Sequence, residues 1–171
     1  MPQSEPGDTV LSRIHAILGG AGVDYRHLTH EPTPTSEDSA RVRGEPLEIG
    51  GKALVLKADG RFLLVVMSAA CRLDSKRLKK HLKAKSMRFA TSEELLELTG
   101  LVPGSVPPFG RPLLELELLA DVSVMAHPRI AFNAGALTES IIMRTSDWET
   151  VAKPQELIDV CLDPPGAPRP G

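Results

Sequence analysis

A glycine- and proline-rich segment, GLVPGSVPPFG at positions 100–110, is the part of the sequence best suited to bind a small polar group. Gly100 and Gly104 permit backbone angles that other residues resist, while Pro103 restricts the chain between them. Backbone N–H groups exposed in such a rigid loop can hold a carbonyl oxygen, a carboxylate or a water molecule. The same composition also fits a stiff connection between a helix and a strand, so the residues alone leave both interpretations open.

A second candidate is Lys52, which follows Gly50 and Gly51 at the start of an apolar stretch typical of a strand. A lysine at the rim of a core strand could bind a phosphate or carboxylate from a rigid position. It could equally be an edge residue that discourages aggregation. Taken alone, the second interpretation is the simpler one.

Two further polar groups flank the predicted strand 129–133, namely His127, which precedes Pro128, and Asn133. Both could hydrogen-bond a polar ligand at one edge of a sheet, or could form turns at the ends of the strand. The other histidines lack the spacing of metal ligands, and we expect no metal site. Ser105 lacks the G-x-S-x-G setting of a hydrolase nucleophile. The chain also has no Walker A loop and no G-x-G-x-x-G motif, which argues against kinase, NTPase and dehydrogenase chemistry.

Basic residues concentrate in one stretch, although the chain as a whole is nearly neutral. The formal net charge is -2, from 20 basic and 22 acidic side chains, which excludes a generally basic nucleic-acid-binding protein. Positions 72–88 nevertheless hold eight basic residues and a single acid, Asp74. Such a stretch could contact a phosphate backbone. A solvated helix face is the plainer explanation from charge alone.

The elements that must position these residues follow from apolar spacing and capping signals. Helices are expected at about 9–18, 36–44, 74–85 and 91–99, with a last one starting near Pro154. Strands are expected at 24–29, 52–57, 62–67, 113–119, 122–126, 129–133 and 139–143. The pair Asp59-Gly60 predicts a hairpin turn. Because the order lacks regular βαβ alternation, it predicts an α+β fold with a mixed, largely antiparallel sheet, curved around a core and flanked by helices.

The length of 171 residues and an ordinary composition predict one folded domain at 8–163. Proline and glycine at both ends predict flexible tails at 1–7 and 164–171. The longest apolar run, 62–67, is too short to cross a membrane. The N-terminus lacks the pattern of a secretory signal, so we expect no membrane association.

The two cysteines, Cys71 and Cys161, lie 90 positions apart and form no recognisable disulfide framework or metal motif. We expect both to be free thiols in a reducing compartment, and therefore a cytoplasmic location. Cys71 could in principle be a thiol nucleophile. A free cysteine is more often a small buried hydrophobic residue.

Taken in order, these motifs resemble those of one protein family. The motifs are HEPT at 30–33, GGKAL at 50–54, DSKRL at 74–78, the loop at 100–110 and FNAGALTESI at 132–141. Over about residues 10–160 the chain resembles the YbaK/ProX family, free-standing relatives of the editing domain of bacterial prolyl-tRNA synthetases. The resemblance implies hydrolysis of the ester that joins a wrong amino acid to the 3′ end of a tRNA. Mischarged tRNA is then the expected partner, and an aminoacyl-tRNA synthetase a further one.

The resemblance also implies roles for individual residues. Lys52 would be catalytic and hold the terminal phosphate or ribose, and Gly104 would be catalytic through a loop backbone that holds the water or the carbonyl. The implied substrate-binding residues are Gly100, Pro103, Ser105, His127, Asn133, Thr29 and Thr35. The implied contacts with the tRNA acceptor stem are Lys76, Arg77, Lys79, Lys80 and Lys83.

An aminoacyl ester is an activated bond, so we expect attack by a positioned water without metal, cofactor or covalent intermediate. In the family, a hydroxyl of the terminal adenosine is thought to help activate that water. Alanine, cysteine, serine and threonine esters all stay open as substrates, and alanine or another small residue on tRNA-Pro is our choice. Two alternatives remain: a non-catalytic module that binds tRNA ends or a synthetase, and a thiol hydrolase that uses Cys71.

Overall fold

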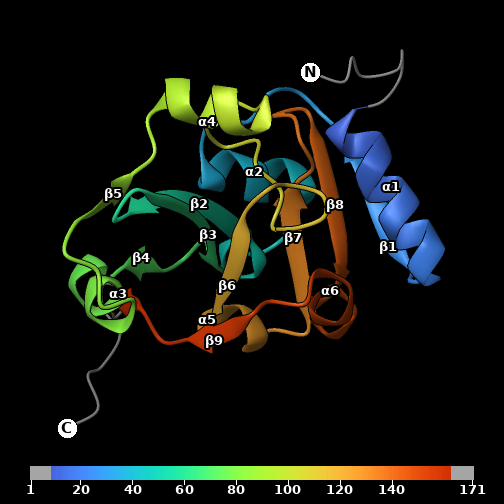
Figure 1. Ribbon diagram of the computed structural model, residues 1–171. Coiled ribbons are helices and arrows are strands. Elements are labelled where there is room, and N and C mark those ends of the chain that lie inside the picture. Colours follow the sequence, from blue (N-terminus) through green and yellow to red (C-terminus); the bar gives the residue numbers. More distant parts are fainter. Residues whose placement is uncertain (1–8, 163–171) are drawn as a thin grey trace, which may run out of the picture.

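The computed structural model describes residues 9–162, in which helices pack around three β-sheets (Figure 1). The predicted tails at 1–7 and 164–171 lie outside the described residues, as do positions 8 and 163 of the predicted domain. Within the described residues, no helix combines the length and the apolar character that a membrane crossing needs.

The largest sheet has five strands in the order β5-β2-β3-β6-β9. Their bounds are β2 Gly51–Ala58, β3 Arg61–Ser68, β5 Met87–Phe89, β6 Glu117–Asp121 and β9 Glu156–Ile158. Strands β2 and β3 form the predicted antiparallel hairpin, with both turn residues at positive φ (Asp59 at 48° and Gly60 at 81°). Strand β6 runs parallel to β3, and β9 runs parallel to β6.

A second sheet has three antiparallel strands in the order β1-β8-β7. Their bounds are β1 Tyr25–Thr29, β7 Arg129–Asn133 and β8 Glu139–Arg144. A single parallel bridge between Gly50 and Ala131 joins this sheet to the start of β2. The third sheet pairs β4 (Arg72–Leu73) with β10 (Cys161–Leu162). The predicted α+β class and largely antiparallel pairing are confirmed, although the strands divide among three sheets instead of forming one.

The helices are α1 Val10–Ala21, α2 Ser36–Arg43, α3 Ser75–His81, α4 Ser92–Thr99, α5 Val122–Met125 and α6 Thr145–Ala152, with a 3-10 turn at Leu47–Ile49. Their N-termini follow the capping signals of the sequence. Thr9 caps α1, Asp74 caps α3, and Thr91 with Glu94 forms a capping box at the start of α4. The cap of α2 is Thr35, directly before the helix predicted at about 36–44.

The main core lies between the two larger sheets and their helices. Helix α1 contributes Ile14 and Leu18, and α6 contributes Trp148, all of them fully buried. The Trp148 indole N–H also donates to the carbonyl of Pro108 at 2.9 Å. The proline-rich segment is therefore fastened to the core along its second half, and it is a fixed part of the fold.

Three predicted elements are wrong in type or position. Residues 122–125, within the strand predicted at 122–126, form α5 instead, because the Asp121 carboxylate accepts a hydrogen bond from Ser123 N at 2.9 Å and caps a helix there. The strand predicted at 113–119 starts only at Glu117. The last helix ends at Ala152, and the chain after Pro154 forms β9.

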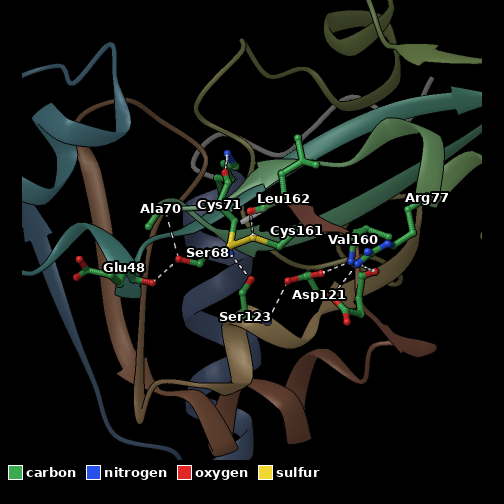
Figure 2. The surroundings of a disulfide bond; sticks show 12 residues. Glu48, Ser68, Ala70, Cys71, Arg77, Asp121, Ser123, Val160, Cys161 and Leu162 are labelled. Atoms are coloured by element: carbon green, nitrogen blue, oxygen red, sulfur yellow. Dashed lines mark hydrogen bonds and ion pairs between the residues drawn. A yellow bond between two sulfur atoms is a disulfide. The ribbon is translucent and has the colours of Figure 1, made fainter. Parts of the chain in front are cut away.

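The prediction of free thiols is also wrong, because Cys71 and Cys161 form a disulfide (Figure 2). The pairing of β4 with β10 brings the two residues together across 90 positions of sequence. Beside them, the buried Asp121 accepts hydrogen bonds from Ser123 N and Val160 N. Cys71 thus has no free thiol to act as a nucleophile while the disulfide is intact.

Candidate active site

A cleft of about 220 Å³ opens where the two larger sheets meet. Three parts of the chain line it: the segment from Thr33 to Arg43, the start of β2, and a wall that contains Gly104 and Asn133. Of the residues predicted from the sequence, the structure brings together Lys52, Gly104, Asn133 and Thr35. Lys52 and Gly104 therefore line one and the same cleft.

Two glycines allow the close approach that forms this cleft. A Cβ on Gly51 would lie 2.7 Å from Cδ1 of the buried Ile130, and a Cβ on Gly50 would lie 3.0 Å from the Cβ of Ala69. Larger residues would push β2 away from β7 at the bridge between Gly50 and Ala131. The GGK motif thus places Lys52 at the junction of the two sheets.

Lys52 is half-buried, and its Nζ donates a hydrogen bond to the backbone carbonyl of Cys71. Burial lowers the pKa of the Lys52 ammonium from its usual value of 10.5; Glu37 opposes this shift, and Arg72 adds to it. Because Cys71 is cross-linked to Cys161, a covalent bond restrains the segment that supplies the carbonyl. One face of the cleft therefore holds a cation whose partner is fixed by the main chain.

Gly104 also lines the cleft, and its φ of 86° is a conformation that favours glycine. Its carbonyl accepts a hydrogen bond from Asn133 Nδ2 at 2.7 Å. Within residues 9–162, its N–H has no hydrogen-bond partner, which leaves this donor available to a ligand. Ser105 supports the loop: its Oγ donates to Val102 O at 2.8 Å, and its carbonyl accepts from Gly135 N at 2.9 Å.

Arg43 is a cleft residue that the sequence did not reveal. Its side chain is nearly buried, and its guanidinium donates to Asn133 Oδ1 at 3.0 Å and to Ser140 Oγ at 2.9 Å. Burial lowers the pKa of Arg43 to about 10, with Glu45 opposing the shift. The available signal was the spacing of Ser39 and Arg43, which puts a serine and an arginine on one face of a short helix.

Hydroxyl groups form another part of the wall. Thr33 and Ser39 are both buried, with Ser39 Oγ donating to Thr33 Oγ1 at 2.8 Å. Thr33 Oγ1 in turn donates to Leu137 O at 3.3 Å. Thr35 caps α2, since its Oγ1 accepts from Asp38 N at 3.1 Å. This side of the cleft is polar and is built by residues 33–39, which lead into α2 and form its first turn.

Several predicted residues lie elsewhere. Thr29 contacts Glu139 at 2.9 Å on the second sheet, and Gly100 caps the C-terminus of α4. Pro103 is exposed in the loop but does not line the cleft. His127 lies in a separate open depression beside the start of α6, at the end of β7 opposite to Asn133.

The predicted tRNA-binding residues lie on and just after α3, outside the cleft. Leu78 anchors this helix in a smaller core, while Lys76, Lys79 and Lys80 are exposed. Lys83 is also exposed, and Arg77 pairs with Asp74 and Asp159. The short β4 connects Cys71 directly to α3, so the basic surface begins next to the residue that Lys52 contacts.

Comparisons with known proteins identify related chains. The family description "Aminoacyl-tRNA editing domain" matches residues 30–151. The chain is 35% identical over 161 residues to the multifunctional Ser/Thr-tRNA deacylase ProXp-y of Escherichia coli, covering 91% of this chain and 95% of the relative. It is 39% identical over 127 residues to a proline–tRNA ligase of Bacillus licheniformis, covering 72% of this chain and 22% of that enzyme.

A solved structure shares the fold. It is described as a proposed trans-editing enzyme for prolyl tRNA synthetase and superposes with a TM-score of 0.76. The match covers 91% of this chain and 98% of that one, at 23% sequence identity.

Proposed function

The chain belongs to the aminoacyl-tRNA editing domain family, and on that premise we propose that it is a deacylase that hydrolyses the ester of mischarged tRNA at the cleft. One observation carries the proposal: Lys52 and Gly104 line the same small cleft, and the Gly104 N–H has no partner within residues 9–162. A cation and a backbone donor are the groups needed to bind a nucleotide end and a developing oxyanion.

In the proposed reaction, water attacks the ester carbonyl directly, because an aminoacyl ester is already activated. The tetrahedral intermediate then breaks its bond to the ribose oxygen, which takes up the proton lost by the water, so that the free amino acid and the tRNA 3′ hydroxyl are released. Lys52 holds the terminal phosphate or ribose, and the Gly104 N–H donates to the oxyanion of the tetrahedral intermediate. A single oxyanion donor contributes about 2.7–4 kcal/mol to catalysis in enzymes where one has been removed. Positioning of the ester in the cleft adds to this effect.

The proposed amino acid is small, as a cleft of about 220 Å³ allows. Alanine on tRNA-Pro is the choice from the sequence. Serine and threonine are a second candidate, which the hydroxyl-lined wall at Thr33 and Ser39 favours. The Escherichia coli relative, named a Ser/Thr-tRNA deacylase, supports the same candidate.

We also propose that the exposed lysines of α3 contact the tRNA acceptor stem and that a synthetase is a further partner. The proposed substrate is charged tRNA, and this supports the cytoplasm as the place of action. The disulfide removes the separate argument from free thiols. A non-catalytic tRNA-binding module remains the alternative and predicts binding without turnover.

The test is a deacylation panel on tRNA charged with alanine, serine, threonine or cysteine. We expect the wild-type protein to release at least one of these amino acids and Lys52→Ala to release none, with an unchanged circular dichroism spectrum. Lys57→Ala, which removes the other lysine of β2, serves as the matched control and should retain activity. Salt-dependent tRNA binding without release of any amino acid would favour the non-catalytic alternative.

A further inference from the structure

Arg43 connects three elements around the cleft that are far apart in the sequence. It lies at the end of α2, and its guanidinium reaches Asn133 on β7 and Ser140 on β8. Only 9% of Arg43 is exposed, and Ser140 is fully buried. The guanidinium therefore links α2 to two strands of the second sheet, β7 and β8.

The chemistry of these groups determines which way the Asn133 amide points. A guanidinium can only donate hydrogen bonds, so Asn133 must turn Oδ1 toward Arg43. The hydroxyl of Ser140 donates to the same oxygen at 3.3 Å. Asn133 Nδ2 is thereby directed to the carbonyl of Gly104, at 2.7 Å. The opposite orientation would place two acceptor oxygens against each other, and they would repel.

The restraint matters because Gly104 has no side chain to hold it. At φ 86° the residue occupies a region in which glycine rotates with little steric cost. The hydrogen bond from Asn133 fixes its carbonyl, and the Gly104 N–H stays without a partner within the described part of the chain. Loss of the Asn133 donor would allow this loop to move at the cleft.

We propose that Arg43 is a positioning residue for deacylation: through Asn133 it holds the Gly104 peptide in the orientation that keeps the N–H available to the oxyanion. This inference rests on the proposed function and assigns to it a residue that acts through Asn133 on Gly104. Arg43 acts on the rate of the chemical step more than on binding.

Two substitutions break the chain of contacts at different links. Arg43→Lys keeps the positive charge but cannot reach both Asn133 and Ser140. Asn133→Asp keeps an acceptor for Arg43 but loses the donor to Gly104. We expect each variant to lower kcat about 10- to 100-fold, with KM changed less than threefold. Arg41→Lys, on an exposed arginine of the same helix, is the matched control and should behave as wild type.

A double-mutant cycle separates a shared path from two separate effects. If Arg43 acts through Asn133, the double variant loses no more activity than the more impaired single variant. In Arg43→Ala, added guanidinium at non-denaturing concentration should restore part of kcat, and ammonium should not. The proposal would be overturned if the loss of kcat in the double variant equalled the product of the two single losses. It would also be overturned if Arg43→Lys had the kcat of the wild type. Activity losses that vanish at a temperature where the variant is fully folded would overturn it as well, since they would mean a purely structural role.

A readout without turnover keeps this test separate from the proposed function. The Gly104 amide resonance should move in both variants and stay in place in Arg41→Lys. If the wild-type protein released no amino acid, the proposed function would fail, while the resonance would still report the link from Arg43 to Gly104. An unmoved Gly104 resonance in both variants would overturn that link.

Discussion

Two regions of the cleft lining hold their functional groups by different means: the Lys52 wall, at the start of β2, and the Arg43 wall, formed by Arg43, Asn133 and Gly104. On the Lys52 wall, the cation sits on a long hairpin strand, and its partner is a main-chain carbonyl next to a disulfide. On the Arg43 wall, side chains from α2, β7 and β8 hold one another through hydrogen bonds. Because backbone and covalent bonds hold the Lys52 wall, substitutions of neighbouring side chains should have little effect on the position of Lys52. On the Arg43 wall each side chain is held by its neighbours, so a single substitution should also displace the groups next to it.

The largest expected effect comes from breaking the covalent restraint of the Lys52 wall. Replacing both cysteines by serine (Cys71→Ser with Cys161→Ser), or reducing the wild-type protein with a dithiol, should lower the free energy of unfolding by about 2–4 kcal/mol. The reason is that the cross-link closes a loop of 90 residues. Thermal unfolding in the oxidised and reduced states measures the change.

The same experiment distinguishes the two walls. Deacylation should weaken as the carbonyl partner of Lys52 loses its restraint, while the Gly104 amide resonance on the Arg43 wall stays in place. Equal stability of the oxidised and reduced proteins would contradict the account of the Lys52 wall.

A smaller effect should follow from separating the walls where they meet. Gly51→Ala places a Cβ 2.7 Å from the buried Ile130 and should destabilise the protein by about 1–3 kcal/mol. Gly19→Ala is the matched control, since an added Cβ in this exposed turn of α1 meets no atom within 4 Å. The control should be stabilising by about 0.5–1 kcal/mol. Denaturant titration measures both, and a neutral Gly51→Ala would show that β2 does not pack closely on β7.

The titration of Lys52 gives a third comparison. Burial lowers its pKa, so the charged form should be lost at a lower pH than for an ordinary lysine, with a midpoint of kcat/KM below 10.5. The folded protein binds this proton more weakly than the unfolded chain does. The free energy of unfolding should therefore rise with pH between the folded pKa and 10.5.

Lys52→Arg keeps its positive charge at high pH, so kcat/KM of this variant should not fall as the pH rises through the Lys52 pKa. The measured rates are corrected for spontaneous hydrolysis of the ester. If kcat/KM falls at high pH in the same way in Lys52→Arg and wild type, the titration belongs to another group.

The smallest effect belongs to the basic surface outside both walls. Replacing Lys76, Lys79 and Lys80 by glutamine should raise KM a few-fold and leave kcat unchanged. In a plot of the logarithm of the tRNA-binding constant against the logarithm of the salt concentration, the slope should become shallower by roughly 0.7–0.9 for each phosphate contact removed. Lys153→Gln, an exposed lysine after α6, is the control. A change in kcat with an unchanged salt slope would contradict a binding role for α3.

The sequence predicts the Lys52 wall far better than the Arg43 wall, and the reason is physical. The hairpin, the Asp59-Gly60 turn and the GGK motif are local signals, and they place Lys52 correctly. The contacts of Arg43 join residues 90 and 97 positions apart, which no local pattern encodes. The disulfide was missed for the same reason, because it depends on the pairing of β4 with β10.

His127 illustrates a limit of motif spacing. It flanks the same strand as Asn133, which suggested a shared site. The five residues of β7 carry their two ends roughly 13 Å apart, since a strand advances about 3.3 Å per residue. Residues 122–126 mark a second limit, where the Asp121 cap overrides the strand preference of valine.

The central claim is that Lys52 and Gly104 bind substrate in one shared cleft. Its most direct test is to map where a substrate analogue binds on the wild-type protein. The ligand is an adenosine that carries serine or alanine through a non-hydrolysable amide at its 3′ position. The backbone amide NMR signals of the protein are recorded as this ligand is added. The account predicts that the Gly104 resonance and those around Lys52 shift together at saturation, while His127 does not respond. Shifts confined to the depression around His127, with Gly104 unmoved, would contradict it.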